Sequence, residues 1–291
     1  MTKTAKRARS VICTLLAFIL SLSVTLTLAC ATLALTALNP DFAVRVVARS
    51  QYSEHLAAEL KEEFISYGNA CNIDEVFFDA VFQNEIAPAR IDADTETVLR
   101  EFYAGEVQDA VDIADLHDAL LNHLTEYAIG KGFAVEPSDD NEIYQNLSTI
   151  ADELCGIYNA YVSVFSMSVF KTASRMLATY RPYAWYGVGA GAVLFVISAV
   201  LLRLYYQKKK NYLRFFIYGF SASALMLAVA PAAALIFRIG NRINIASAAL
   251  YTLATGMING TLAAVLLSAL VPALVTVLLV LVRNKAVKNN C

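Results

Sequence analysis

The chain has 291 residues, of which 58% are hydrophobic and only 16% are charged. With a mean hydropathy of +0.52, this composition excludes an ordinary soluble domain. The net charge of −2 hides a division, because all 25 acidic residues lie between Asp41 and Glu153. That window holds six basic residues and has a net charge of −19, whereas the other residues include 17 basic ones and no acid. We therefore expect an acidic part and an apolar part in different compartments.

A basic N-terminus, residues 1–10, precedes an uncharged run at residues 11–38. About 20 apolar residues cross a bilayer, so this run predicts the first transmembrane helix. The alternative is a cleaved signal peptide with its cleavage site near Cys30, or, as a weaker variant, a lipid-modified Cys30. The run exceeds the roughly 7–15 apolar residues of a signal core, which favours a retained anchor.

Residues 39–182 contain the acidic window and show helical periodicity with little strand alternation. We expect helices that begin near Ser53, Asp74 and Asp94 and a further helix over Leu116–Tyr127, with a loop at Asn84–Thr95. Prolines at 40 and 182 are expected to break the chain at the two ends of this region. The sequence thus predicts a helical-bundle domain inserted between the first and second membrane spans.

The clearest predicted helix in this domain has apolar residues spaced alternately by four and three. They are Ile143, Leu147, Ile150, Leu154, Ile157, Tyr161 and Val164. This spacing is typical of a heptad seam, which packs against neighbouring helices.

Three further apolar runs predict the remaining membrane helices. We place these helices at residues 183–204, 215–237 and 259–282, separated by a basic loop at 205–214 and by an outer loop with an interfacial helix at 238–258, and followed by a tail at 283–291. The fold class is therefore all-α, a multi-pass membrane protein with four transmembrane helices. Small-xxx-small pairs, Gly187 with Gly191 and Gly256 with Gly260, are expected to let helices approach closely.

Lysine and arginine residues predict the orientation. They cluster before the first span, after the fourth span, and in the loop between the second and third spans. The loop cluster consists of Arg203, Lys208, Lys209, Lys210 and Arg214. By the positive-inside rule these clusters are cytoplasmic. We expect a plasma-membrane protein with both termini inside and residues 39–182 outside.

Catalytic and metal-binding motifs are weak in this chain. His55, His117 and His123 match no metal or catalytic pattern. Asp92, Asp94 and Glu96 resemble the start of a calcium loop, but the turn glycine and the bidentate glutamate are missing. A solvated acidic face is the favoured interpretation, with weak calcium binding as the alternative.

The acidic region contains two cysteines, Cys71 and Cys155, which could form a disulfide on an oxidising side of the membrane. The four uncharged runs contain no Asp, Glu, Lys, Arg or His, which argues against a proton-coupled transporter. We expect no cofactor and no nucleic-acid partner.

The order of one span, a large outer domain and three spans resembles cell-division permeases of the FtsX type and other mechanotransmitting ABC-transporter subunits. The resemblance is one of topology, because no residue motif is shared and those relatives have a mixed α/β outer domain. It implies an accessory or permease-like subunit of a transport or division complex. The preferred hypothesis is a non-enzymatic membrane protein whose acidic outer domain binds a protein partner or senses a ligand.

Overall fold

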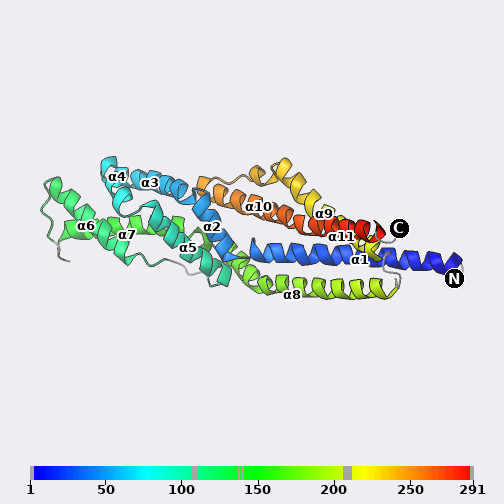
Figure 1. The fold of residues 1–291 in the computed structure, drawn as a ribbon. Helices are drawn as coiled ribbons and strands as arrows, with labels where there is room; N and C mark the ends of the chain where they lie inside the picture. Colours follow the sequence, from blue (N-terminus) through cyan, green and yellow to red (C-terminus); the bar gives the residue numbers. More distant parts are fainter. Residues whose placement is uncertain (1–2, 107–110, 137, 139–140, 206–211, 289–291) are drawn as a thin grey trace. The chain divides into compact units, whose positions relative to one another are not determined.

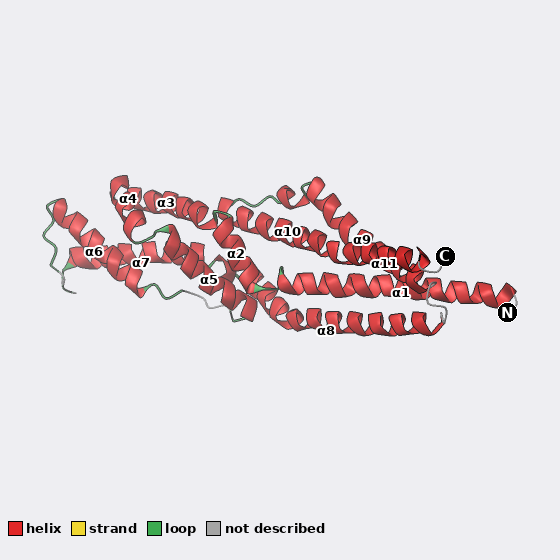
Figure 2. Ribbon diagram, in the orientation of Figure 1, coloured by secondary structure: helices red, strands yellow, loops and turns green. Residues whose placement is uncertain are grey.

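The computed structural model describes residues 3–106, 111–136, 138, 141–205 and 212–288, and these residues form helices and no strand (Figures 1 and 2). The all-α class predicted from the sequence is confirmed. The elements in chain order are α1 (Lys3–Leu35), α2 (Pro40–Arg49), α3 (Tyr52–Ala70), α4 (Glu75–Asn84), α5 (Pro88–Ala104), α6 (Ala114–Gly130), α7 (Glu142–Val162), η1 (Val164–Ser166), α8 (Ser168–Tyr205), α9 (Tyr212–Ile236), η2 (Ile239–Arg242), α10 (Ala248–Ser268) and α11 (Leu270–Lys288).

Within the described residues, four segments are long and apolar enough to cross a membrane. They are Ser10–Leu35, Phe170–Tyr205, Tyr212–Ile236 and Ala248–Lys285. The structure therefore has four candidate membrane spans, the number that the sequence predicts.

The fourth candidate span differs from its predicted form. A separate interfacial helix was expected to end at residue 258, but α10 begins at Ala248 and continues without a break to Ser268. The helix is interrupted only at Ala269, after which α11 begins at Leu270. Apolar residues on both sides of 258 sustain a single helix, and the glycines at 256 and 260 are tolerated inside it.

The two expected proline breaks have different outcomes. α1 ends at Leu35 and α2 begins at Pro40, where a proline suits the first helical position because its missing N–H needs no partner there. Pro182, in contrast, lies inside α8, which is continuous over 38 residues. The predicted joint at Pro182 is wrong, because an interior proline can be accommodated within a long helix as a local kink.

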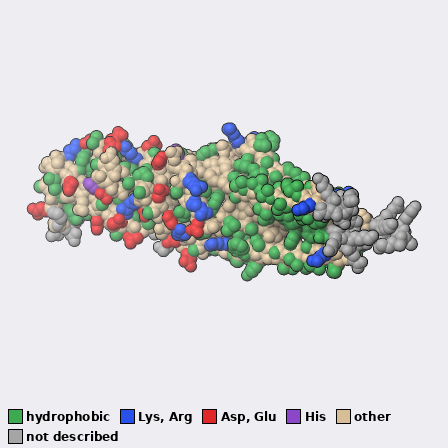
Figure 3. Space-filling view, viewed as in Figure 1, with side chains coloured by type: hydrophobic (Ala, Val, Ile, Leu, Met, Phe, Trp, Pro, Cys, Tyr) green, Lys and Arg blue, Asp and Glu red, His purple; other side chains and the backbone are tan. Residues whose placement is uncertain are grey.

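The chain divides into two compact units. Unit 1 consists of residues 1–42, 179–243 and 255–291, and unit 2 consists of residues 43–178 and 244–254. Apart from Asp41, the acidic residues belong to unit 2, and the helices of unit 1 present mainly hydrophobic side chains (Figure 3). Three helices contribute residues to both units, since α2, α8 and α10 each cross a boundary between these ranges.

Unit 1 is built on α9, which packs against both α1 and α11. Its buried cluster contains Leu16 and Leu20 of α1, with phenylalanines of α9 packed around them. At Gly219 of α9 a Cβ atom would lie 2.6 Å from Leu20 Cδ2, so the glycine permits this close approach. The Thr25 hydroxyl donates to the Ser223 hydroxyl across the same pair of helices, at 3.0 Å.

Unit 2 is a bundle in which α3 contacts α4, α5 and α7, and α6 contacts α7. Its core is made of large side chains that are fully buried. They include Tyr52, Leu60, Phe64, Phe78, Ile91, Leu116, Leu120, Leu124, Leu154 and Tyr158. The bundle places two cavities along α3 and α7, which form the candidate sites.

The segment predicted as a loop at Asn84–Thr95 is largely helical. α5 starts at Pro88 and continues to Ala104, so Asp94 lies inside the helix and does not cap it. Pro88 explains the difference, since it fits the first turn of a helix and was interpreted as a loop residue. Asp74, in contrast, does occupy the N-cap of α4, as expected.

Candidate functional site

The helix α7 has two apolar sides, and unit 2 fully buries only one of them. The buried side consists of Ala151, Leu154, Cys155, Tyr158 and Val162. In the predicted seam only Leu154 is fully buried, and the other six residues remain partly exposed. The predicted packing face is therefore wrong by about one residue, or 100° of helix rotation. We call these six partly exposed residues the α7 stripe.

Part of the α7 stripe lines a cavity of about 560 Å³, which we call the α6–α7 groove. The groove is bordered by the end of α3, by α6 and its following turn, and by the start of α7. Its lining includes Leu124, Tyr127, Lys131, Phe133, Ile143, Leu147 and Ile150. Phe133 is 57% exposed, so apolar surface continues outside the groove. A volume of this size is in the range of natural ligand sites.

A charged network lies at one edge of the α6–α7 groove. Asp74 accepts hydrogen bonds from Lys131 Nζ at 2.6 Å and from the Tyr127 hydroxyl at 2.8 Å. The Lys131 ammonium also lies 5.2 Å from the centre of the Tyr127 ring. These contacts lower the pKa of Asp74 and raise the pKa of Lys131. Since the three groups pair with one another, Lys131 is held at the groove edge.

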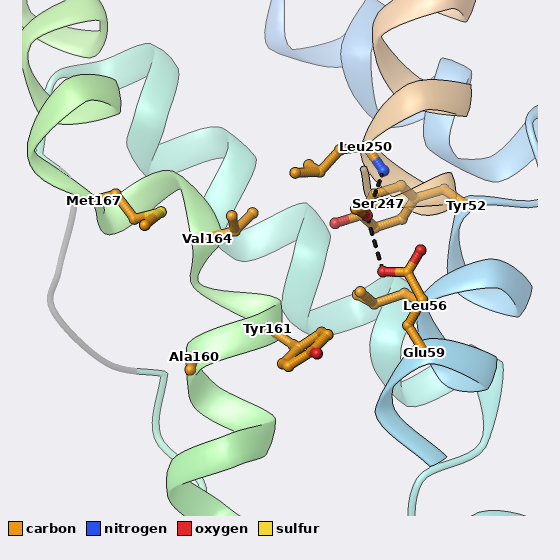
Figure 4. Close-up of a pocket in the computed structure, with 9 residues that line it drawn as sticks. All are labelled: Tyr52, Leu56, Glu59, Ala160, Tyr161, Val164, Met167, Ser247 and Leu250. Carbon is orange, nitrogen blue, oxygen red and sulfur yellow. Dashed lines mark hydrogen bonds between the residues drawn. The ribbon is translucent and has the colours of Figure 1, made fainter. Parts of the chain in front are cut away.

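A second cavity of about 210 Å³ lies between α3, the end of α7 and the start of α10, all within unit 2 (Figure 4). We call it the Glu59 cavity. It is lined by Tyr52, Leu56, Glu59, Ala160, Tyr161, Val164, Met167, Ser247 and Leu250. Two members of the α7 stripe, Tyr161 and Val164, therefore belong to this cavity.

Glu59 caps the N-terminus of α10. Its Oε1 accepts hydrogen bonds from the backbone N–H groups of Ala248 at 2.6 Å and Ala249 at 3.1 Å. Its Oε2 accepts from the Ser247 hydroxyl at 2.9 Å, and the Ser247 oxygen in turn accepts from the Leu250 N–H (Figure 4). A carboxylate is favourable at this end of a helix because free N–H groups and the helix dipole are positive there.

The tyrosines of the Glu59 cavity are exposed to negative charge. Burial and then the charge of Glu59 raise the pKa of Tyr52, and an interaction with the Thr95 hydroxyl opposes this shift. The pKa of Tyr161 is raised by burial and by Glu63, Glu59 and Glu62, in that order. Both shifts indicate a negative potential around the cavity.

A polar cluster joins three helices on another side of unit 2. Arg90 of α5 donates to Asp115 of α6 at 2.8 Å, and Tyr158 of α7 donates to Asp94 of α5 at 2.5 Å. His117 Nε2 of α6 lies 3.2 Å from Asp152 Oδ1 of α7 without completing a hydrogen bond. We call these six residues the Arg90 cluster. Because its members pair with one another across helices, the cluster ties the bundle together.

Lowering the pH is expected to reduce the stability of unit 2 through protonation of Asp115 in the Arg90 cluster. Arg90 lowers the pKa of Asp115, so this aspartate stabilises the fold above its ordinary pKa. The contribution is lost as the pH falls through the lowered, folded-state pKa. The side chain of Asp115 is 70% exposed, so solvent screening limits the effect to about 1 kcal/mol or less. Urea unfolding of the full chain in detergent between about pH 5 and pH 3 measures it.

The matched variant for this acid effect is Asp115→Asn, which removes the titrating group and keeps the side-chain shape. It should be less stable than the natural chain at pH 5 and should lose less stability on acidification. An unchanged slope of stability against pH in this variant would contradict the assignment.

The predicted metal candidates do not converge. Asp92, Asp94 and Glu96 all lie on α5, where residues two apart point to different sides. Asp94 is bound by Tyr158, and Glu96 accepts from Arg100 at 2.8–2.9 Å. In the part of the chain that the structure describes, no three His, Cys, Asp or Glu side chains form a group that could hold a metal ion.

The three histidines are dispersed over unit 2. His117 belongs to the Arg90 cluster, and His123 lies 3.2 Å from Glu85. His55 is on the first half of α3. They do not share one site.

The two cysteines of the acidic region are free thiols in the structure, so the disulfide expected between Cys71 and Cys155 is not formed in it. Cys71 lines the α6–α7 groove, whereas Cys155 is buried on the core side of α7. Burial and then the charge of Asp152 raise the pKa of Cys155 to about 11. At neutral pH this thiol remains protonated and is a poor nucleophile.

The predicted sites of the membrane part lie in unit 1. A Cβ on Gly187 would meet Cys30 Sγ at 2.7 Å, and one on Gly191 would overlap Thr27, so both glycines face α1. A Cβ on Gly260 would lie 2.9 Å from the Phe42 ring. Gly256 is one turn earlier on α10.

Of the predicted basic cluster, Arg203 lies in the last turn of α8, and Arg214 contacts Tyr218 near the start of α9. Lys208, Lys209 and Lys210 lie outside the described residues.

No sequence motif marks Glu59 or Tyr52 as a site residue. The partners of Glu59 at the start of α10 are 188 to 190 residues away along the chain. One local signal was present, since Ser247 precedes a helix and serine is a favoured cap residue. That signal marks the start of α10 but does not identify the carboxylate that binds it.

Unit 2 thus offers two sites of different chemistry, a broad apolar groove and a smaller cavity with a carboxylate. No family model matches this chain, and no curated protein or solved structure matches it.

Proposed function

We propose that the chain is a non-enzymatic integral membrane protein of the cell envelope, and that unit 2 binds a protein partner in the α6–α7 groove. The observation that carries this proposal is the α7 stripe. Ile143, Leu147 and Ile150 follow a helix-packing period, yet the helices of unit 2 leave them partly exposed. A helix from another protein laid along this stripe would complete its burial.

The negative net charge of unit 2 indicates that its partner is basic. Residues 41–153 carry a net charge of −19, and the groove helices α6 and α7 expose Glu126 and Glu142. An acidic surface attracts and orients a basic partner. We therefore propose an amphipathic helical segment with apolar residues toward the groove and lysine or arginine residues at its edges.

The proposed orientation places unit 2 outside the cytoplasm. Its support is the distribution of basic residues, since the clusters before the first span, after the fourth span and between the second and third spans are consistent with one cytoplasmic side. Thr149 is exposed on α7, so the variant Thr149→Cys in a chain without other cysteines should react with a membrane-impermeant maleimide in intact cells.

A binding role is also supported by the arrangement of the polar residues. Asp115 and Asp94 accept hydrogen bonds from Arg90 and Tyr158 on neighbouring helices, and the Cys155 thiol is protonated at neutral pH. Groups engaged in this way act as structural links between helices and are not poised for proton transfer to a substrate.

Photo-crosslinking tests the proposed partner site. A photoreactive amino acid at Leu147, which lines the groove, should yield a discrete adduct when the full chain is expressed in its native membrane. The adduct should decrease at least about tenfold in the variant Ile150→Asp, because a buried unpaired carboxylate in the interface costs more than 1.4 kcal/mol.

The same photoreactive residue at Thr149 provides the control, since this exposed position is two residues from Leu147 and points away from the groove. It should give no adduct of the same mass. Equal adducts from the two positions, or an adduct that persists in Ile150→Asp, would contradict the proposed site.

A further inference from the structure

The Glu59 cavity contains one carboxylate and has two more nearby. Glu59 lines the cavity, Glu62 and Glu63 are exposed on the following turn of α3, and all three raise the pKa of Tyr161. In the described parts of the chain, no lysine, arginine or histidine forms an ion pair with any of these glutamates. A cation is the group that this side of the cavity lacks.

Glu59 also retains capacity for one more hydrogen bond. Its Oε1 already accepts from two backbone N–H groups, but its Oε2 accepts only from the Ser247 hydroxyl. A carboxylate oxygen can accept two hydrogen bonds, so an N–H donor in the cavity can bind Oε2 without displacing the cap of α10.

A second polar group of the cavity is unpaired. Tyr52 is fully buried, and its hydroxyl completes no hydrogen bond with any described residue, although the Thr95 hydroxyl is nearby and is also unpaired. Figure 4 shows the Tyr52 ring lying across the cavity next to Ser247. Buried polar groups without partners are uncommon in proteins, and a bound ligand is one explanation.

The other walls of the cavity are apolar or aromatic. Leu56, Val164, Met167 and Leu250 provide aliphatic surface, and the Tyr161 ring lies on the side opposite Glu59 (Figure 4). Tyrosine rings attract organic cations through their π-electrons. The cavity volume of about 210 Å³ admits a short chain and excludes a large ligand.

We propose that the Glu59 cavity binds an alkylammonium ion, with its cationic nitrogen beside Glu59 and Tyr52 and its short apolar chain against Leu56, Val164 and Leu250. This site is separate from the α6–α7 groove and does not depend on a partner there. Leu250 lies in the first turn of α10, directly after Ala248 and Ala249, whose N–H groups Glu59 binds.

Calorimetric titration of the full chain in lipid nanodiscs with n-butylammonium tests the proposal, with empty nanodiscs as the blank. Saturable binding is expected, and the neutral analogue 1-butanol should show none. The variant Val164→Trp fills the cavity and should abolish binding. The double variant Glu62→Gln/Glu63→Gln removes two charges and should weaken binding about fivefold.

Two controls make the outcome unambiguous. Glu75→Gln/Glu126→Gln causes the same change in net charge at exposed positions outside the cavity and should bind like the natural chain. Ile150→Asp, in the groove, should also bind normally, so that failure of the partner proposal does not affect this result. Saturable binding of 1-butanol, unchanged binding by a folded Val164→Trp, or no saturable binding of n-butylammonium would overturn the proposal.

Discussion

Replacing Glu59 with alanine is expected to release the first turn of α10 from unit 2. The variant loses the acceptor of two backbone N–H groups and of the Ser247 hydroxyl. Hydrogen bonds to a charged group are worth more than neutral ones, and a lost cap costs about 2 kcal/mol here. Hydrogen exchange should therefore accelerate about 30-fold at Ala248 and Ala249, as followed by mass spectrometry of the full chain in nanodiscs.

The neighbouring variant Glu62→Ala is the matched control, because it removes an exposed carboxylate of the same helix that makes no hydrogen bond to α10. Glu59→Gln should give an intermediate rate, since its amide oxygen retains an acceptor but not the charge. If exchange at the first turn of α10 were the same in Glu59→Ala and the natural chain, Glu59 would not be its cap.

The largest loss of stability is expected from Phe64→Ala in the core of unit 2. Phe64 is fully buried on α3 and packs edge to face against Phe78 and Phe82 of α4, with ring centres 6.1 and 5.3 Å away. Removing such a ring leaves a cavity and destabilises a domain by about 3–5 kcal/mol. Urea unfolding followed by near-ultraviolet circular dichroism measures the loss.

Val76→Ala is the corresponding control on α4, because Val76 is 75% exposed. Its effect should be within about 0.5 kcal/mol. Gly68→Ala probes the same contact in the opposite direction, since a Cβ there would overlap the Phe78 ring, and overpacking costs about 1–3 kcal/mol. A Phe64→Ala variant as stable as Val76→Ala would show that α3 and α4 do not pack through these rings.

The four candidate membrane spans and the helical class could be predicted because they depend on composition and local period. An uncharged run of sufficient length has few alternatives, and apolar spacing of three and four is specific to helices. The helix ends were harder to predict, because a proline can start a helix, lie inside it or break it. Pro88 was assigned to a loop although it starts α5, and Pro182 was expected to end a helix that passes through it.

The packing face of α7 could not be assigned because the helix has apolar residues on adjacent sides. Leu154 belongs to both sides, and the small residues Ala151 and Cys155 define the one that is buried. Heptad spacing is easier to recognise among large apolar side chains than among small ones. It therefore predicts the α7 stripe, part of which lines the cavities, as the packing face. The Glu59 site could not be predicted for a different reason, because it joins α3 to residues that follow two further candidate spans in the sequence.

The long separation between Glu59 and Ser247 in the sequence also means that the two residues are synthesised at different times. At about 5–20 residues per second, ribosomes need roughly 10–40 s to synthesise the 188 positions that separate them. Residues 43–178 are complete before that time, so the α3–α7 bundle can fold while its last segment does not yet exist. During this interval the Glu59 carboxylate lacks its partners Ser247, Ala248 and Ala249, which have not yet been synthesised. A bundle that folds in this interval remains without its residues 244–254 until the ribosome has made them.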